Sequence, residues 1–402
     1  MASTSATLSA PGRTQAFLST LYGMADGERI RRCLQCGMCS GACPYGYLMD
    51  FPPSRLITSL RAEEFDQVLV SDTAWLCLSC YACTQVCPMQ IPVTAALMTR
   101  TKEELLLAGK VPSELHAALE SSQRYGNVLG QSPRKRAEWV RELDPPVRIL
   151  GKENVQAEVL WYVGDYVSYH PRLQAVGRAV AQVLHALGVD FAILGPDEVS
   201  DGDSQRLAGE RGLFEMLAEK NGKALGRVRF ERIVTTDPHA YNAFRNEYPA
   251  LGISYPVQHL TQFLAERVDQ LRPLLTREVQ ARVAFHDPCF LGRVNSVYEE
   301  PRAVLAAIPG VELVEMAHTR AMSLCCGGGG GGMWLDGFHW EKAHARTSEW
   351  RVQEACNAGA DILAVACPYE PLRFEDAVKV VPGARELVVR DVAELVAQAL
   401  TA

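Results

Sequence analysis

The second half of the chain alternates short apolar runs with longer amphipathic stretches. Runs rich in aliphatic and aromatic residues predict strands, and apolar residues three or four apart predict helices between them. The predicted strands are residues 157–163, 191–194, 232–236, 282–285, 311–314 and 362–365, and the clearest helix is residues 174–187. Strands that alternate with helices form parallel sheets, so we expect an α/β half whose special residues lie in loops at strand ends.

This alternation occurs twice. Asp165 and Ser200 follow successive strands of the first copy, 35 residues apart, while Cys289 and Cys325 take the corresponding places in the second copy, 36 residues apart. Such a repeat predicts two similar units in one chain. We place the first unit at residues 157–275 and the second at residues 276–402.

The first half of the chain has mainly helical patterns. Apolar residues recur at helical spacing in residues 14–31 and 55–70. The predicted divisions are a disordered N-terminus at residues 1–14, a first domain at residues 15–110 and a helical linker at residues 111–156. The basic cluster of the linker, Arg134-Lys135-Arg136, is expected on a solvated helix face.

Composition limits the compartment and the partners. With 48% hydrophobic residues, 22% charged residues and a net charge of −7, the chain has no basic excess for nucleic acid or an anionic membrane. No run of about 18 uncharged apolar residues predicts a membrane span, and the N-terminus lacks the apolar core of a signal peptide. Thirteen cysteines without an export signal favour metal ligation over disulfides. We expect a cytoplasmic protein, with any membrane association made through a partner.

Eight of the cysteines form two runs of the same spacing, C-x2-C-x2-C-x3-C-P. In the bacterial ferredoxin run, three cysteines bind one [4Fe–4S] cluster and the fourth binds the other. By that rule the first cluster takes Cys33, Cys36, Cys39 and Cys87, and the second takes Cys77, Cys80, Cys83 and Cys43. Zinc is the alternative, but it needs four ligands, and each run supplies a third closely spaced cysteine and a terminal Cys-Pro. The spacing therefore favours two [4Fe–4S] clusters.

A third candidate site surrounds Cys325-Cys326, which six glycines follow at residues 327–332. Two adjacent cysteines can bind one metal centre only if the backbone folds closely around it, which glycine permits. Cys289 and Cys367 lie at similar distances on either side, each next to a proline. A glycine linker would not be bracketed in this way, and a phosphate loop is excluded because no Gly-Lys-Ser/Thr follows.

Three stretches of the N-terminal part resemble the ferredoxin-like C subunit of heterodisulfide reductases. They are Cys36-Gly-Met-Cys39, residues 49–55 (MDFPPSR) and residues 75–81 (WLCLSCY), and the resemblance covers roughly residues 25–105. Each later repeat resembles the cysteine-rich CCG domain, and the pair resembles the B subunit. The whole is similar to the fused D-type subunit. The resemblance implies a mixed α+β and α/β fold, with an N-terminal helical bacterial-ferredoxin-like 2[4Fe–4S] module followed by two repeated α/β CCG domains.

The family pattern is Cys, then Cys-Cys-Gly, then Cys-Pro-x-Cys, and the first repeat has lost all of these cysteines. In their places stand Asp165, Ser200-Asp201, Asp237 and Ala240. Thiolates suit iron–sulfur clusters, whereas carboxylates do not. We expect a former site kept as scaffold, with acids that are solvated or cap helices. A hard-ion site at Asp165, Asp201 and Asp237 is the alternative.

The second repeat keeps Cys289, Cys325, Cys326 and Cys367, while Glu370 replaces the last cysteine of the pattern. The resemblance implies a third cluster there, either a non-cubane or a cubane [4Fe–4S] cluster, with a [2Fe–2S] centre as a further alternative. It also implies catalytic roles for Cys325, Cys326 and Glu370, which could be an oxygen ligand. His286 is a candidate proton donor, and Cys356 is expected to be a buried small hydrophobe.

These expectations converge on an electron-transfer subunit of a heterodisulfide reductase-like complex, which relays electrons between the two clusters and the third. A disulfide or thiol substrate, or a partner carrying flavin or quinone, would stand at one end. No Gly-x-Gly-x-x-Gly follows a strand, so flavin belongs on another chain. The expected partners are a flavoprotein, a protein like the A subunit of heterodisulfide reductase or another electron-transfer protein, or a quinone-reactive membrane subunit. The alternatives are an iron–sulfur subunit of a glycolate, lactate or glycerol-3-phosphate dehydrogenase, and a relay without its own substrate.

Overall fold

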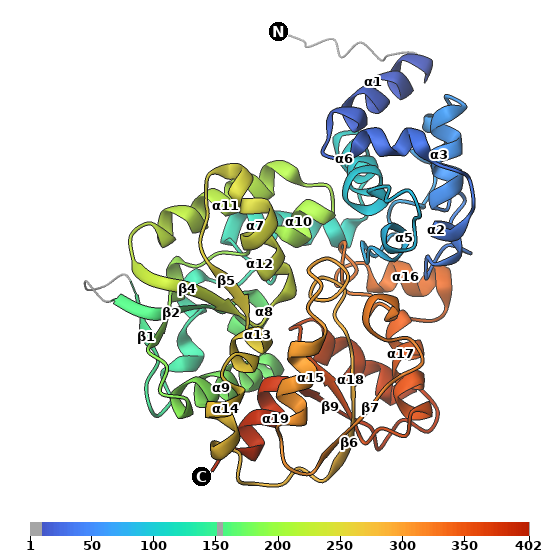
Figure 1. Ribbon diagram of the computed structural model, residues 1–402. Coiled ribbons are helices and arrows are strands. Elements are labelled where there is room, and N and C mark those ends of the chain that lie inside the picture. Colours follow the sequence, from blue (N-terminus) through green and yellow to red (C-terminus); the bar gives the residue numbers. More distant parts are fainter. Residues whose placement is uncertain (1–9, 151–155, 402) are drawn as a thin grey trace.

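A helical N-terminal module stands on two α/β units (Figure 1). The computed structural model describes residues 10–150 and 156–401. The helices of the module are α1 (Ala10–Gly23), α2 (Met38–Gly41), α3 (Pro53–Arg61), α4 (Phe65–Val68), α5 (Ala82–Gln85) and α6 (Thr99–Leu107). Residues 10–14, which we expected to be disordered, begin α1, whereas residues 1–9 of that prediction lie outside the described ranges.

The first α/β unit is built on a parallel sheet of order β1-β3-β2-β4-β5. Its strands are β1 (Arg148–Ile149), β2 (Gln156–Tyr162), β3 (Phe191–Ile193), β4 (Arg229–Thr235) and β5 (Val257–His259). Its helices are α8 (Asp165–Tyr169), α9 (Pro171–Ala186), α10 (Asp203–Leu207), α11 (Arg211–Leu225), α12 (Pro238–Asn242), α13 (Leu260–Ala265) and α14 (Val268–Leu271). The linker contributes α7 (Ser113–Tyr125) and the edge strand β1.

The second unit has a parallel sheet of order β7-β6-β8-β9. Its strands are β6 (Ala281–Phe285), β7 (Val311–Val314), β8 (Ile362–Val365) and β9 (Val388–Asp391). Its helices are α15 (Glu299–Ala306), α16 (Asp336–Ala343), α17 (Thr347–Asn357), α18 (Glu370–Val380) and α19 (Val392–Ala399). Without the edge strand β1, both sheets have their strands in the order second, first, third, fourth. The predicted repeat of parallel α/β units is therefore confirmed.

The two units share one apolar core. That core takes side chains from α9 and α13 of the first unit and from α15 and α19 of the second. At its edge, Arg172 of α9 donates hydrogen bonds to Glu375 of α18 and Glu394 of α19. Burying apolar surface between the units is the main force that holds them together.

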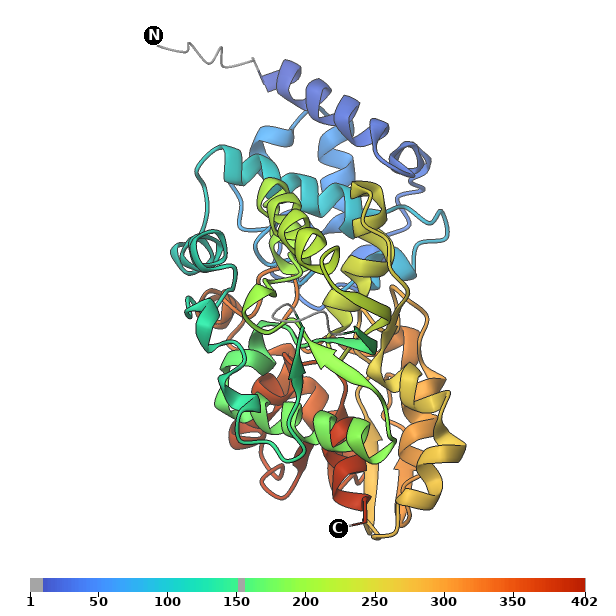
Figure 2. The same cartoon turned by 90° about the vertical axis from the view of Figure 1, so that its left-hand side faces the viewer.

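The N-terminal module packs against both units, as Figure 2 also shows. Its core includes Leu207 and Leu217 from the first unit and Phe290 and Leu335 from the second. Across the boundary with α16, His339 Nε2 lies 2.9 Å from the carbonyl oxygen of Trp75. This arrangement places the carboxyl ends of β6 and β8 toward the module, and loops at such ends form the sites of parallel sheets.

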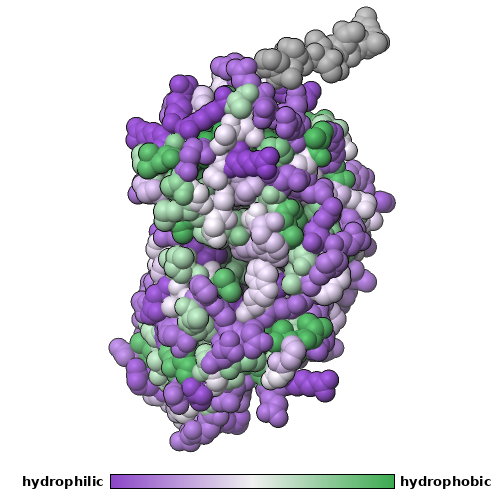
Figure 3. Space-filling model, turned by 90° about the vertical axis from the view of Figure 1, so that its right-hand side faces the viewer, coloured by the Kyte–Doolittle hydropathy of each residue, from purple (hydrophilic) through white to green (hydrophobic). Residues whose placement is uncertain are grey.

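Figure 3 shows one face of the molecule, on which polar and apolar side chains are intermixed without a broad apolar band. Within the described ranges, no helix is both long and apolar enough to span a bilayer.

Candidate metal centres

Eight cysteines of the N-terminal module converge in two groups of four. Cys33, Cys36, Cys39 and Cys87 line one cavity, and Cys43, Cys77, Cys80 and Cys83 line another. Burial raises the pKa of the Cys43 thiol well above its ordinary value, and the nearby charges of Cys80, Cys77 and Cys83 raise it further. Thiols that oppose one another's ionisation in this way are suited to ligate a cationic centre, which removes their protons.

The two runs adopt the same backbone turn. Gln35 and Gly37 of the first run, and Ser79 and Tyr81 of the second, all have positive φ angles, between 50° and 79°. Gly37 and Tyr81 immediately precede α2 and α5, which carry Cys39 and Cys83. Equal spacing in the sequence therefore gives equal local geometry, with the last cysteine of each run placed at the other group.

The glycine run forms the third site by folding tightly on itself. A Cβ on Gly332 would lie 2.0 Å from the carbonyl oxygen of Gly327, so no other residue fits there. The amide of Gly327 donates to Cys325 Sγ at 3.3 Å, and the amide of Gly328 donates to Cys326 Sγ at 3.4 Å. Amide hydrogen bonds to ligand sulfurs are one of the means by which proteins tune iron–sulfur potentials.

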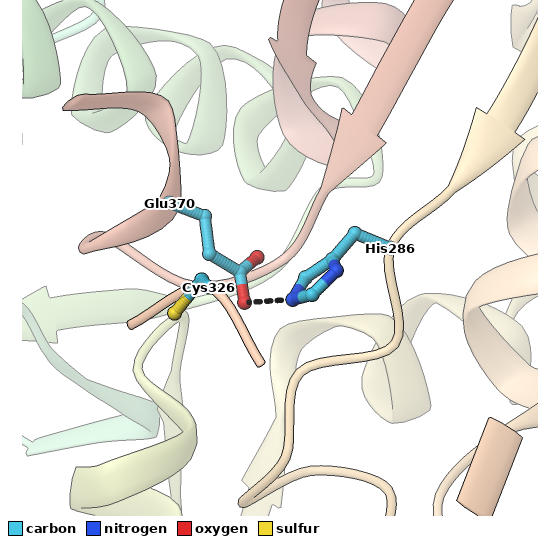
Figure 4. Close-up of side chains that lie close together, drawn as sticks. All are labelled: His286, Cys326 and Glu370. Atoms are coloured by element: carbon cyan, nitrogen blue, oxygen red, sulfur yellow. Dashed lines mark ion pairs between the residues drawn. The ribbon is translucent and has the colours of Figure 1, made fainter. Parts of the chain in front are cut away.

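Beside the glycine run, His286, Cys326 and Glu370 form a buried group whose potential ligand atoms all lie within 4.8 Å of one another (Figure 4). His286 follows β6, and Glu370 is the first residue of α18, after β8. His286 Nε2 lies 3.2 Å from Glu370 Oε1. The amide of Ala366 donates to the other carboxylate oxygen at 3.2 Å.

The protonation of this group follows from its neighbours. Arg351 Nε donates to His286 Nδ1 at 3.0 Å, so the ring proton of a neutral His286 lies on Nε2, the atom that faces Glu370. Burial lowers the pKa of His286 well below its ordinary value, and the charges of Arg351 and Arg293 lower it further. Burial also raises the pKa of Glu370 well above its ordinary value. Both shifts favour the neutral form of each group, and a metal ion bound by Glu370 would displace a proton from it.

The remaining cysteines of the second unit occupy three environments. Cys289 and Cys325 pack in the core of the N-terminal module. The pKa of Cys289 is raised well above its ordinary value, mainly by a hydrogen bond with Cys325 and secondly by burial. Cys367 lies in the core between the two units, where burial and then Glu370 raise its pKa. Cys356 in α17 is only partly buried, against apolar side chains of the second sheet.

In the first unit, the acids at the expected cysteine positions are buried, so solvation, the first of the two alternatives expected for them, is wrong. Asp165 accepts hydrogen bonds from Arg136 Nη2 at 2.5 Å and from the amide of Val128 at 3.1 Å. Arg136 also donates to Glu198 at 2.8 Å and is only 2% exposed, so the prediction that it lies on a solvated helix face is wrong. Asp165 therefore anchors the linker to the first unit.

The other two acids have separate roles. Asp237 caps α12 by accepting from the amide of His239 at 2.8 Å, as predicted for a capping acid. Asp201 accepts from the amide of Asp203 at 2.8 Å. Over the described ranges, Asp165, Asp201 and Asp237 do not bring their ligand atoms within 4.8 Å of one another, so they do not form a metal site.

Two cations lie near the sites, and the sequence analysis assigns a role to neither. Lys102 of α6 is fully buried, and Arg293 is partly buried between the module and the second unit. Nothing in the sequence marks Lys102, because a single lysine in a helical pattern is ordinarily exposed. Arg320, by contrast, forms partly exposed ion pairs with Glu299 and Glu315.

Comparison with known protein families agrees with this architecture. A cysteine-rich domain model, CCG, matches residues 159–245 and 283–369, and a 4Fe-4S dicluster domain model matches residues 29–91. The matched segments contain the eight cysteines of the module, parts of β2 and β6, and all of β3, β4, β7 and β8.

Three relatives illustrate the range of similar proteins. The chain is 35% identical to the probable iron-sulfur-binding oxidoreductase FadF of Bacillus subtilis over 90% of its length and 50% of that protein. It is 32% identical to the EtfAB:quinone oxidoreductase of Syntrophomonas wolfei over 83% of its length and 47% of that protein. It is 30% identical to the D-type subunit of the dihydromethanophenazine:CoB–CoM heterodisulfide reductase of Methanosarcina mazei, over 87% of its length and 82% of that relative. The chain thus spans about half the length of the first two relatives.

Proposed function

Because the chain belongs to the family of iron–sulfur proteins that includes the D-type subunit of heterodisulfide reductase, we propose that it is an electron-transfer subunit of a redox complex. One observation carries the proposal: Cys80 of the N-terminal module and Cys325 of the glycine-run site line a single cavity of about 250 Å³. A ligand of the second cluster and a ligand of the third site thus meet at one boundary, where electrons can cross.

The first two ligand sets follow the convergence of the module cysteines, and the third follows the cysteine pattern of the family. Cys33, Cys36, Cys39 and Cys87 would hold the first cluster, and Cys43, Cys77, Cys80 and Cys83 would hold the second. The third would be held by Cys289, Cys325, Cys326 and Cys367, with Glu370 as an oxygen ligand in place of the missing cysteine. When bound, these clusters supply one-electron transfer at potentials that their hydrogen bonds and burial set.

The outer end of the relay lies at the first cluster site. Cys36 is exposed there, and the flanking Leu34 and Met38 are 65% and 51% exposed. Exposed apolar side chains beside a redox centre suit a partner that docks closely. The partner classes proposed are a flavoprotein, another electron-transfer protein or a quinone-reactive membrane subunit, and the last would bring the chain to a membrane.

At the inner end, Cys325, Cys326, Glu370 and His286 are the proposed catalytic residues. Reduction of a disulfide substrate to two thiols consumes two electrons, which the partner supplies, and two protons. His286 carries a ring proton on the nitrogen that faces Glu370. This imidazole would hold a proton next to Cys326, with Arg351 fixing its orientation, while Glu370 as a ligand would be deprotonated.

A relay without its own substrate is the second candidate, and burial favours it. Cys325, Cys326 and Glu370 are only 2%, 6% and 1% exposed, and the family's last cysteine is replaced. A centre closed in this way would pass electrons to a partner without binding a disulfide.

Addition of thiol to oxidised protein distinguishes these candidates. Anaerobically reconstituted wild type, Cys326→Ser and the control Cys356→Ser would be followed by EPR before and after addition of dithiothreitol. The substrate-binding proposal predicts a changed third-centre spectrum in wild type and Cys356→Ser, and none in Cys326→Ser. If the wild-type spectrum is unchanged while all clusters are loaded, the disulfide proposal is wrong and the closed relay stands.

A further inference from the structure

The boundary between the N-terminal module and the third site contains two cations that the proposed function does not use. Lys102 Nζ donates to the carbonyl oxygen of Cys77 at 2.9 Å and to that of Gly330 at 2.8 Å. These two acceptors lie in the second-cluster loop and in the glycine run. One ammonium group therefore bridges two segments that are distant in sequence, since Lys102 and Gly330 are 228 residues apart.

Arg293 makes a second bridge of the same kind. Its Nε donates to the carbonyl oxygen of Cys80 at 2.8 Å, and its Nη1 donates to the carbonyl oxygens of Ala321 and Ser323. Cys80 ends the same second-cluster loop, and Ser323 lies just before Cys325. Lys102 and Arg293 thus bind opposite ends of the Cys77–Cys80 loop. Lys102 connects that loop to Gly330, and Arg293 connects it to Ser323; we call residues 321–332 the third-site loop.

Within the described ranges, neither cation forms an ion pair with an acidic side chain. Their hydrogen-bond acceptors are backbone carbonyl oxygens, and two of these belong to the candidate ligands Cys77 and Cys80. A buried cation without an anion is unfavourable, so both positions become favourable when the cysteines are thiolates, as they are in a cluster.

The contact between the two loops is also direct. A Cβ on Gly329 would lie 2.7 Å from the carbonyl oxygen of Leu78, and one on Gly330 would lie 2.5 Å from Ser79 Oγ. Cys80 of the second-cluster loop and Cys325 also line the same cavity. The glycine run therefore does more than fold around its own cysteines: it allows the second-cluster loop to approach.

We infer that Lys102 and Arg293 are positioning residues that clamp the second-cluster loop onto the third-site loop and set the electron-transfer junction between the two centres. This inference rests on the proposed function, which requires electrons to pass across that boundary. The clamp has two effects: it holds the loops in contact, and it places two positive charges beside the second cluster.

The test compares Lys102→Met and Arg293→Met with wild type as reconstituted full-length protein. Methionine preserves much of the side-chain volume but removes the charge and the donors. Because positive charge stabilises the reduced form of a cluster, each variant should shift the midpoint potential of the second cluster to a more negative value, with the first cluster unchanged. EPR-monitored redox titration measures both potentials, and the magnetic interaction between the second cluster and the third centre should weaken.

The matched controls are Lys110→Met and Arg320→Met. Lys110 is exposed near the end of α6, and Arg320 forms its ion pairs at the surface of the second unit. Both should leave the two potentials unchanged. Hydrogen exchange gives a readout independent of electron transfer: amides of residues 77–80 and 327–332 should exchange faster in the two clamp variants than in the controls.

Unchanged second-cluster potential and unchanged exchange in both clamp variants, with iron retained, would overturn the inference. If a methionine variant loses iron, Lys102→Arg and Arg293→Lys test the inference in its place, because these variants keep the positive charge. Near-wild-type potential in these variants supports the clamp, and a loss equal to that of the methionine variants contradicts it. If wild type lacked iron at the third site, the proposed function would fail, while the second-cluster potential would still test the clamp.

Discussion

At the scale of single residues, Asp165 has a structural role. It stands where the family has its first cysteine, yet it pairs with Arg136, which Glu198 also contacts. Glu198 in turn accepts from the amides of Val163 and Gly164, at the carboxyl end of β2. Asp165 and Glu198, through Arg136, thus connect the carboxyl end of β2 to the linker.

Removal of the Arg136 charge should therefore destabilise the first unit. Arg136→Met leaves two buried carboxylates without their cation, and breaking a buried pair in this way typically costs about 3–5 kcal/mol. The neighbouring Lys135→Met is the control, since Lys135 is exposed and a surface change usually stays within about 0.5 kcal/mol. Urea unfolding followed by tryptophan fluorescence measures both. Equal midpoints for the two variants would contradict the role given to Arg136.

The residues that sequence reasoning misplaced have partners far along the chain. Arg136 looked solvated because its neighbours in sequence are basic, whereas its partners are 29 and 62 residues away. Lys102 carried no signal because one of its acceptors is a backbone carbonyl of the glycine run. The cysteine runs were easier, since the ligands of a turn lie within a few residues of one another and their spacing fixes the geometry.

At the scale of elements, the glycine run is the part whose composition the structure explains most fully. Gly330 has a positive φ of 61°, and a Cβ there would meet Ser79 Oγ at 2.5 Å and the carbonyl oxygen of Cys77 at 2.9 Å. Gly332 is required for the fold of the run itself. The run is therefore a close-packed surface that contacts the N-terminal module, and not a linker.

Gly330→Ala should consequently separate the run from the second-cluster loop. The expected result is a destabilisation of about 1–3 kcal/mol, typical of overpacking, with faster loss of cluster absorbance on heating. Gly337→Ala is the matched control, because a Cβ there would meet nothing within 4 Å. In helix α16 that change should be neutral or stabilising by up to about 1 kcal/mol. Equal cluster lifetimes for the two variants would contradict the close contact.

The elements themselves were largely predictable where they are long or strongly apolar. The expected strands at residues 311–314 and 362–365 coincide with β7 and β8, and the expected helix at residues 174–187 overlaps α9. The edge strands β1, β5 and β9 were not predicted. They are only two to four residues long and mix polar with apolar side chains, so their pairing depends on the neighbouring strand and not on local pattern.

At the scale of the whole molecule, the protein joins a dicluster domain to two CCG units, of which one keeps cysteines. The units share a core, and the module rests on both, so the second-cluster loop meets the third site. The sequence could predict this order of parts from its repeats and motifs. It could not predict which surfaces meet, because packing between domains depends on side chains that no local pattern connects.

Iron and acid-labile sulfide analysis, with EPR, on wild type, Cys326→Ser and Cys356→Ser tests the central claim most directly. Three four-iron clusters predict about twelve irons in wild type and in Cys356→Ser, and about eight in Cys326→Ser. The EPR signals of the two module clusters should be the same in all three proteins. About eight irons in every protein, with no change on substitution of Cys326, would contradict a third iron–sulfur centre and leave a two-cluster relay.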